Sequence, residues 1–367
     1  MPTPMIKVLI SAGGSGGHLF PMISVAQAIS EKYGNVQIRF VGTKRRIEAK
    51  VLPQYGYKTH YINIRGFYRS GIRSTLLSLI LLPLAILKSM LIIIRFRPHV
   101  VLGSGSFTSG PVLLAALILC RRTAIQEQNA SPGLTNRFLG RFSDIAFLAT
   151  EPKDKNVFKN YIVTGNPIRK SIHQLSETNV EISLSPIKIY LVGGSQGAHK
   201  LNQALIECLP KLEPYSDRIS IHHQTGEKDF KEIREVYSKS SVEGTATEFI
   251  DDIELAYKDA SLIISRSGSV VFEFLAAGKP SILIPIPWSS GDHQKSNAET
   301  LVSANAAKMI EERELTGNSL FAAIEQCILN PEKLIEMGKN ARSLYTGNSA
   351  DKIAEELSGF FPKISEN

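Results

Sequence analysis

One pattern occurs twice in this chain of 367 residues and constrains its fold more than any other feature. Near the start, an apolar run at residues 6–12 leads into a glycine-rich turn at 13–17, and His18 follows. Further along, an apolar run at 187–192 leads into a second glycine-rich turn at 193–197. Glycine lets a backbone approach a ligand closely, and the free amides at a helix start attract phosphate. The repeat predicts two similar α/β domains that face a central cleft.

Strand-like runs alternate with helical runs along the whole chain, as in parallel sheets with crossover helices. The runs in the first half cover residues 6–12, 36–42, 57–63, 99–103, 123–126 and 144–149. Those in the second half cover residues 187–192, 219–223, 245–249, 261–265, 281–286 and 307–311. Ligands of such doubly wound folds bind beyond the carboxyl ends of the strands, where the glycine-rich turns lie. We therefore expect two Rossmann-like sheets.

The turn-rich segment at residues 163–167 marks the predicted domain boundary. We expect an N-terminal domain of residues 1–165 and a C-terminal domain of residues 166–345. The polar, helical tail at 346–367 is expected to pack back toward the N-terminal domain. Three cysteines, odd in number and widely spaced, fit a reducing compartment and predict no disulfide framework. The N-terminus lacks a signal-peptide pattern, which favours the cytosol.

Charge is distributed unevenly behind a net charge of +8. Residues 1–165 hold 21 Lys and Arg against 6 Asp and Glu, a balance of +15, whereas the rest of the chain has a balance of −7. This asymmetry favours an anionic partner for the N-terminal half over charge that merely keeps the protein soluble. Nucleic acid is not the partner that we expect.

Residues 65–97 form the most unusual stretch. Its central part, 76–94, is apolar apart from Ser78, Pro83, Lys88 and Ser89, and arginines flank it at positions 65, 69, 73, 95 and 97. A helix of this length would reach about 28 Å, enough to span a bilayer core. The alternatives are a buried crossover helix, or a helix or helix pair broken near Pro83. We favour the last, with one face on the sheet and the other in an anionic lipid surface, because strand-like segments lie on both sides.

Candidate site residues in the first half follow three strands. The first turn offers Gly13, Gly14, Ser15, Gly16 and Gly17, and His18 at the helix start suits a proton acceptor as well as a local hydrogen-bonding role. A further glycine turn at 103–111 contains Gly105 and Phe107. Residues 126–129 (Gln-Glu-Gln-Asn) place amides and a carboxylate at a strand end, which suits the binding of sugar hydroxyls.

Candidate site residues in the second half suit a nucleotide. Ser195 lies in the second repeat turn, where backbone amides and a hydroxyl can cradle phosphate. Residues 265–273 follow a strand, and their Glu273 is suited to grip the hydroxyls of a ribose. Gln294 follows a proline-rich turn. We find no paired metal-ligand motif, and we interpret His222-His223 as strand-end packing.

Together these motifs resemble the MurG family of bacterial peptidoglycan N-acetylglucosaminyltransferases over nearly the whole chain. The motifs that carry the resemblance are Gly13 to His18 with Pro21, Gly103 to Pro111, Glu127 to Asn129, Gly165 to Arg169, Gly193 to Gly197, Thr247 to Asp252, Arg266 to Gly268, Glu273 and Gln294. The resemblance implies the two-domain GT-B fold. It also implies an inverting transfer of N-acetylglucosamine from UDP to the 4-hydroxyl of the muramyl sugar of lipid I, without a cofactor or a bound metal.

The resemblance also implies residue roles. The C-terminal domain would hold UDP-N-acetylglucosamine through Phe249 and Ile250 at uracil, Glu273 at ribose and Gln294 at the sugar. The residues implied at the diphosphate are Arg169, Ser195, Ser269 and Val270. The N-terminal domain would hold lipid I at the turn 13–17, with Gly105 and Phe107 nearby. His18 would be the general base, and Asn129 and Glu127 would lie near the reacting sugars.

The resemblance further implies a peripheral enzyme on the cytoplasmic face of the plasma membrane, with cell-wall or division proteins as candidate partners. The chain departs from the family pattern at Gln126, where histidine is usual, and at Phe107, where tyrosine is usual. The stretch 266–273 is one residue shorter than in many members. Three alternatives remain open: a GT-B transferase for another membrane lipid, a UDP-N-acetylglucosamine epimerase, and a non-catalytic nucleotide-binding adaptor.

Overall fold

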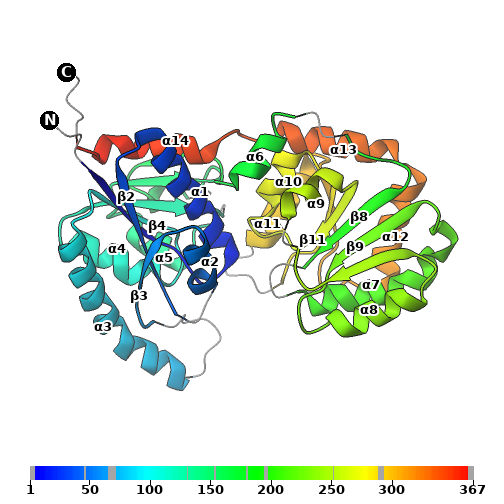
Figure 1. The fold of residues 1–367 in the computed structure, drawn as a ribbon, viewed down its shortest axis with the longest axis horizontal. Helices are drawn as coiled ribbons and strands as arrows, with labels where there is room; N and C mark the ends of the chain where they lie inside the picture. The colour runs from blue at the N-terminus through cyan, green and yellow to red at the C-terminus, as the bar shows by residue number, and fades with distance from the viewer. Residues whose placement is uncertain are drawn as a thin grey trace. The chain divides into compact units, whose positions relative to one another are not determined.

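The computed structural model describes residues 5–44, 47–64, 72–129, 131–152, 154–178, 181–193, 197–250, 252–287 and 293–362, with the side chains of residues 72–80 left out. The chain forms two compact units (Figure 1). Unit 1 consists of Met1–Arg169 and Asn348–Asn367, and unit 2 consists of Lys170–Gly347. The chain therefore leaves unit 1 once and returns to it near its end.

Unit 1 is built on a parallel sheet of seven strands in the order β3-β2-β1-β4-β5-β6-β7. The strands are β1 (Ile6–Ser11), β2 (Val36–Gly42), β3 (Lys58–Tyr61), β4 (Val100–Gly103), β5 (Arg122–Glu127), β6 (Ile145–Leu148) and β7 (Tyr161–Val163). The strand order reverses between β1 and β4, where Ser11 pairs with Gly103. The glycine turns that follow these two strands are therefore neighbours at the switch point, where doubly wound folds bind ligands.

Helices cover both faces of the unit 1 sheet because alternate strand residues point to opposite sides. Val8 and Ile10 belong to a core cluster with residues of α1 and α14, whereas Leu9 and Val41 belong to one with residues of α3 and α4. The helices are α1 (Gly16–Tyr33), α2 (Glu48–Gln54), α3 (Ile72–Phe96), α4 (Ser109–Ile118), α5 (Leu134–Leu139) and α14 (Ser349–Leu357). The tail helix α14 lies along α1, where the Tyr33 hydroxyl donates to the Ala354 carbonyl at 3.3 Å.

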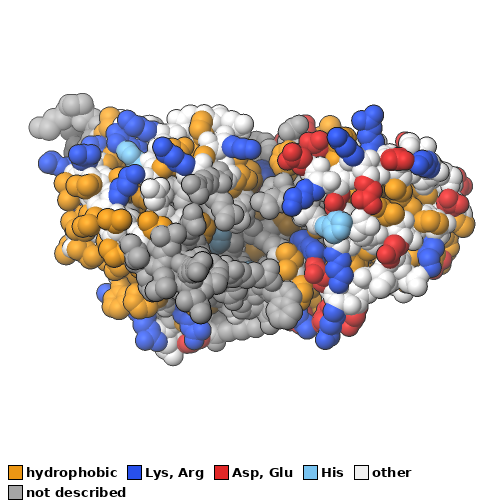
Figure 2. Space-filling model, turned by 90° about the horizontal axis from the view of Figure 1, so that it is seen from below, with side chains coloured by type: hydrophobic (Ala, Val, Ile, Leu, Met, Phe, Trp, Pro, Cys, Tyr) orange, Lys and Arg blue, Asp and Glu red, His pale blue; other side chains and the backbone are white. Residues whose placement is uncertain are grey.

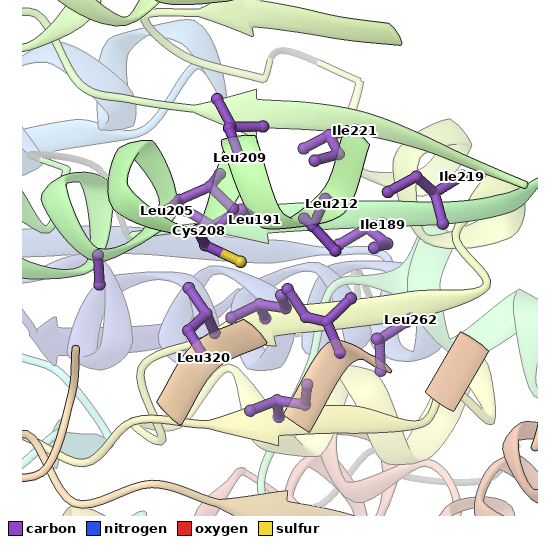
Figure 3. Close-up of a cluster of buried hydrophobic side chains, with 14 of the residues drawn as sticks. Ile189, Leu191, Leu205, Cys208, Leu209, Leu212, Ile219, Ile221, Leu262 and Leu320 are labelled. Atoms are coloured by element: carbon purple, nitrogen blue, oxygen red, sulfur yellow. The ribbon is translucent and has the colours of Figure 1, made fainter. Parts of the chain in front are cut away.

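Unit 2 repeats this plan with six parallel strands in the order β10-β9-β8-β11-β12-β13. The strands are β8 (Ile187–Val192), β9 (Ile219–Gln224), β10 (Glu243–Thr247), β11 (Leu262–Ser265), β12 (Ser281–Leu283) and β13 (Ala307–Met309). The helices are α6 (Lys170–Leu175), α7 (His199–Leu212), α8 (Phe230–Lys239), α9 (Ile253–Asp259), α10 (Val271–Ala277), α11 (His293–Ser303), α12 (Gly317–Leu329) and α13 (Glu332–Ser343). Figure 3 shows side chains of β8, β9 and β11 packing with those of α7 and α12 in one buried cluster.

The sheets confirm the predicted α/β class of two doubly wound domains, and the repeated turns follow the equivalent strands β1 and β8. Strand β7 was missed because it has three residues and runs directly into the turn that we read as a boundary. The backbone of α3 continues through Pro83, so the break suggested there is absent. A proline removes one helical hydrogen bond, and strong helix formers beside it carry the helix onward.

Candidate functional site

The first glycine turn leads from β1 into α1, and His18 lies in the first turn of that helix. Ser15 precedes the helix with an extended backbone and makes no side-chain cap, and the first turn contains no acidic residue. The positive end of the α1 dipole is therefore not compensated by a carboxylate in the first turn of the helix. This end of the helix suits an anionic group close to the His18 side chain.

A buried carboxylate, which the sequence did not suggest, supports this turn. Glu48 at the start of α2 is fully buried and accepts hydrogen bonds from the Gly14 amide at 3.1 Å, the Thr43 amide at 2.9 Å and the Thr43 hydroxyl at 2.8 Å. A Cβ atom on Gly13 would lie 2.5 Å from Glu48 Oε1, so only glycine fits there. The one signal in the sequence is that Glu48 is the sole acid in the basic run 44–50.

The turn after β4 packs against the first turn. A Cβ atom on Gly14 would lie 2.8 Å from the Phe107 ring, so the two loops are in close contact. Gly105 has a φ of 75°, and a Cβ atom there would lie 2.3 Å from Asn136 Nδ2. The Ser109 hydroxyl ties the turn to the Ser11 carbonyl at 2.8 Å. The predicted residues Gly105 and Phe107 thus lie beside the predicted turn 13–17.

Glu127, at the end of β5, accepts hydrogen bonds from the loop that follows it and from α5. It accepts from the Asn129 amide and side chain at 2.9 Å each, from the Gly133 amide at 3.0 Å and from Asn136 Nδ2 at 2.9 Å. Burial raises the pKa of Glu127 above its ordinary value, although these hydrogen bonds favour the carboxylate. The geometry suits a group that orients Asn129, and Asn136 is a second residue that the sequence did not indicate.

Gln126 and Arg169 also belong to unit 1. The Gln126 side chain is buried and donates to Asn166 Oδ1 at 2.9 Å, so an amide pair occupies the place where the family usually has histidine. The Arg169 guanidinium lies 4.2 Å from the centroid of the Phe20 ring. Phe20 is in α1, two residues after His18. Arg169 therefore belongs to unit 1 and lies beside the first turns of α1. We had predicted that it belongs to the C-terminal domain, which would bind the donor.

In unit 2, the repeat turn follows β8. Ser195 lies outside the described residues, but both sides of its turn are described. Gly197 has a φ of 74°, and a Cβ atom there would lie 2.2 Å from the Thr225 carbonyl oxygen. Glycine is thus required for the turn to pass the end of β9. This close approach resembles that of the first turn, although different partners enforce it.

Glu273 lies in the first turn of α10 and is only 7% exposed. Its Oε2 accepts a hydrogen bond from the buried Tyr257 hydroxyl at 3.0 Å, which fixes the carboxylate. Ser269 and Val270 lie immediately before this helix. Arg266, at the beginning of the same loop, pairs with Glu312 at 2.5 Å, and Ser267 donates to the Gln294 carbonyl at 2.8 Å.

The predicted uracil residues follow β10. Phe249 is 49% exposed, whereas Ile250 is buried and its amide donates to Gln224 Oε1 at 3.1 Å. The Gln294 side chain accepts from the Ile286 amide at 3.1 Å, which ties α11 to the end of β12. Gln224 is a third supporting residue that the sequence pattern did not reveal.

Among the described residues, no group of three or more His, Cys, Asp or Glu is arranged to hold a metal ion. His223 contacts Asn202 at 3.0 Å and is buried, and burial lowers its pKa to about 3. Packing at the end of the strand, as we interpreted it, accounts for this histidine.

The surface of unit 1 carries an apolar stripe along α3. Leu84, Leu87, Leu91 and Ile94 are each at least half exposed, at spacings that place them on one face of the helix. The opposite face buries Ala85, Ile92, Ile93 and Phe96. Figure 2 shows hydrophobic side chains gathered on unit 1 with lysines and arginines around them. No helix in the described part of the chain combines the length and apolarity needed to cross a membrane.

Comparisons with known proteins identify the chain. The model of the glycosyltransferase family 28 N-terminal domain matches residues 8–148, and that of the family 28 C-terminal domain matches residues 188–357. The UDP-N-acetylglucosamine--N-acetylmuramyl-(pentapeptide) pyrophosphoryl-undecaprenol N-acetylglucosamine transferase of Geotalea uraniireducens (strain Rf4) is 41% identical and aligns over 96% of this chain and 98% of its own length. The enzyme of the same name from Anaeromyxobacter sp. (strain Fw109-5) is 40% identical and aligns over 95% of this chain and 92% of its own length.

Solved structures agree. Acinetobacter baumannii MurG is 27% identical, with a TM-score of 0.77, and the match covers 97% of this chain and 100% of that one. The UDP-GlcNAc 2-epimerase of Neisseria meningitidis is 17% identical, with a TM-score of 0.67, and the match covers 96% of this chain and 100% of that one. At this identity the match shows a shared fold alone. The fold is GT-B, and the chain belongs to the MurG family of glycosyltransferase family 28, as the sequence resemblance predicted.

Proposed function

We propose that this chain transfers N-acetylglucosamine from UDP-N-acetylglucosamine to lipid I and so forms lipid II in peptidoglycan synthesis. The observation that carries the proposal is identity of about 40% with N-acetylglucosamine transferases of this name across nearly the full length of both chains. The epimerase likeness extends to the fold alone, so it gives no support to epimerase chemistry.

Unit 2 binds the donor in this proposal. The exposed Phe249 ring offers a face for uracil, and the next residue, Ile250, is buried. Glu273, held by Tyr257, accepts from the ribose hydroxyls. Ser269 and Val270, and Ser195 in the repeat turn, contact the diphosphate, and Gln294 contacts the sugar. Of these residues, Ser269 and Val270 lie in the short loop between β11 and α10.

Unit 1 binds the acceptor in this proposal. The lipid diphosphate binds at the turn 13–17 because the start of α1 attracts negative charge. His18 takes the proton of the muramyl 4-hydroxyl as its oxygen forms a bond to C1 of N-acetylglucosamine. The bond between C1 and the diphosphate oxygen breaks, and UDP leaves with the electron pair. Because the 4-hydroxyl oxygen attacks the face of C1 opposite to UDP, the anomeric centre is inverted. Asn129, oriented by Glu127, contacts the reacting sugars.

The membrane contact of this proposal is the α3 stripe. Its exposed leucines enter the lipid interface while the buried face remains on the sheet. The enzyme then acts as a peripheral protein on the cytoplasmic face, which is consistent with three free cysteines.

Arg169 stacks beside the α1 start and supplies positive charge to a diphosphate there.

The test uses the purified full-length chain with pairs of substrates. Labelled UDP-N-acetylglucosamine and UDP-glucose are each offered with a short-chain lipid I analogue and with diacylglycerol. We expect efficient product only from UDP-N-acetylglucosamine with the lipid I analogue. Preferred transfer to diacylglycerol would favour the alternative of a different lipid acceptor. Binding of UDP-N-acetylglucosamine without transfer to either acceptor would contradict the catalytic assignment.

A further inference from the structure

A pocket in unit 2 lies where α10 packs against α6 and α13 (Figure 1), and it shares no residue with the candidate donor site. Its volume is about 510 Å³, which is the size of a small-molecule site. The chain after α6 contributes Ile182, the end of α10 contributes Ala277 and Gly278, and α13 contributes Ile335. The pocket therefore has apolar side chains on three sides.

Three charged side chains also line this pocket: Glu181, Lys339 and Arg342. The two cations are three residues apart on α13, which places them on one face of the helix. Arg342 is half-buried; its Nη2 donates to the Leu175 carbonyl at 2.9 Å, whereas its Nη1 is buried and has no hydrogen-bond partner in the described structure. The ion pairs of the described residues in unit 2 include none of the three side chains.

These features favour one kind of ligand. A buried guanidinium nitrogen without an acceptor is unfavourable, and burial lowers the pKa of Arg342 below its ordinary value because the charged form is poorly solvated. A carboxylate or a phosphate can accept two parallel hydrogen bonds from a guanidinium. Glu181 would repel a second negative charge, and the isoleucines favour an apolar body. The chemistry of the pocket therefore suits one anionic group on an apolar molecule.

The pocket lies at one end of α10, and Glu273 lies near the other. Glu273 is in the first turn of this seven-residue helix, and Gly278 follows its last residue. A Cβ atom on Gly278 would lie 3.3 Å from Arg342 Nε, and a Cβ atom on Gly338 of α13 would lie 2.6 Å from the Gly278 carbonyl oxygen. Because the packing is this close, a movement of Arg342 toward an anion would reach the end of α10.

We propose that this pocket binds a small organic anion, a carboxylate or phosphate on an apolar body, and that its binding changes the affinity of the donor site through α10. The pocket and its ligand chemistry are independent of the proposed function. The coupling rests on the proposed role of Glu273 at the ribose.

Methyl NMR of the full-length protein with labelled isoleucine tests the binding, since Ile182 and Ile335 line the pocket. The probes are benzoate, phenyl phosphate and neutral benzamide, which share one ring. We expect at least one of the two anions to shift both methyl signals and benzamide to shift neither, and the tighter anion identifies the preferred group. Equal shifts by benzamide, or no shift by any probe, would overturn the binding site.

Three variants locate the charge. Arg342→Gln should weaken binding of the tighter anion about tenfold or more, because charge-assisted hydrogen bonds are lost. Lys339→Gln, which removes an exposed cation and so tests the site even if Arg342→Gln unfolds, should weaken it about two- to fivefold. The control is Lys333→Gln, an exposed lysine of α13 outside the pocket, with a change below about twofold. Equal effects of Lys339→Gln and Lys333→Gln would mean diffuse attraction and overturn the site.

Calorimetry with UDP tests the coupling. With the pocket saturated by the tighter anion, the Kd for UDP should change by about fivefold or more, and saturating UDP should change the affinity for the anion by the same factor. An unchanged Kd would overturn the coupling, as would an effect of equal size in Lys339→Gln and Arg342→Gln at the same anion concentration, which would mean competition at the donor site. If UDP does not bind the wild type, the donor assignment of the proposed function has failed, whereas the methyl shifts still decide on the pocket.

Discussion

Replacing Glu48 by glutamine should loosen the first glycine turn without touching the donor half. In the wild-type protein, Oε1 of Glu48 accepts from the Thr43 amide and hydroxyl, and Oε2 accepts from the Gly14 amide. In Glu48→Gln, the amide oxygen can keep the two Thr43 bonds. The new NH₂ group then faces the Gly14 amide, donor against donor, in a fully buried site.

The size of this effect follows from the contacts that are lost. One hydrogen bond to a carboxylate disappears, and two donors lack acceptors: the half-buried Gly14 amide and the buried NH₂ group of the new side chain. A buried unsatisfied group costs about 1–3 kcal/mol, so we expect the free energy of unfolding to fall by about 2–4 kcal/mol. Because Gly14 has a φ of 90° and contacts Phe107, the acceptor loops should move together.

Urea unfolding and steady-state kinetics together measure the outcome. We expect a higher KM for a short-chain lipid I analogue and an unchanged KM for UDP-N-acetylglucosamine. The control is Glu151→Gln, whose carboxylate is exposed and contacts only the Tyr161 hydroxyl at 3.4 Å among its hydrogen bonds in the described structure. It should alter stability by less than about 0.5 kcal/mol. A Glu48→Gln protein with wild-type stability and acceptor KM would refute the reasoning.

Three further predictions concern the other parts of the account. Glu273→Gln should weaken UDP binding about 10- to 100-fold, because a charge-assisted hydrogen bond is lost, and calorimetry showing wild-type affinity would contradict the ribose role. Gly105→Ala should lower the melting temperature, since its Cβ would lie 2.3 Å from Asn136 Nδ2 at a φ of 75°; an unchanged melting temperature would show that the loop adapts freely. Leu87→Ser with Leu91→Ser should weaken vesicle binding about 30-fold, at about 1 kcal/mol for each half-exposed leucine, whereas Leu255→Ser with Leu329→Ser should not; equal behaviour of the two pairs would argue against the α3 contact.

The sheets were predictable because their strands are short apolar runs bounded by glycine. Buried parallel strands read as nearly continuous hydrophobic segments, so β1 and β8 could be placed within a residue. The alternating apolar residues of β2 and the start of β9 placed those two strands equally well. The position of the sites followed from the same logic, because the glycine turns end the strands at the switch points. Strand β7 lacked both the length and the flanking signal.

The supporting contacts of the sites were not predictable from local patterns. Glu48 meets Gly14 across 34 residues, and Asn136 meets Glu127 across nine, so neither partner is visible in a sequence window. The sequence predicted that one face of α3 packs on the sheet, but it did not show which residues form that face. The buried and exposed faces of this helix are both apolar, and only the packing of Ile92, Ile93 and Phe96 on the sheet distinguishes them.

The measurement that tests the central claim most directly is transfer of N-acetylglucosamine to a short-chain lipid I analogue by the wild-type protein and by His18→Ala, with UDP affinity measured on both. The account predicts a β-linked product from the wild type. For His18→Ala it predicts turnover reduced about 10²- to 10⁴-fold, the range for loss of a general base, with unchanged UDP affinity. Absence of product from the wild type, or near-normal turnover in His18→Ala, would contradict it.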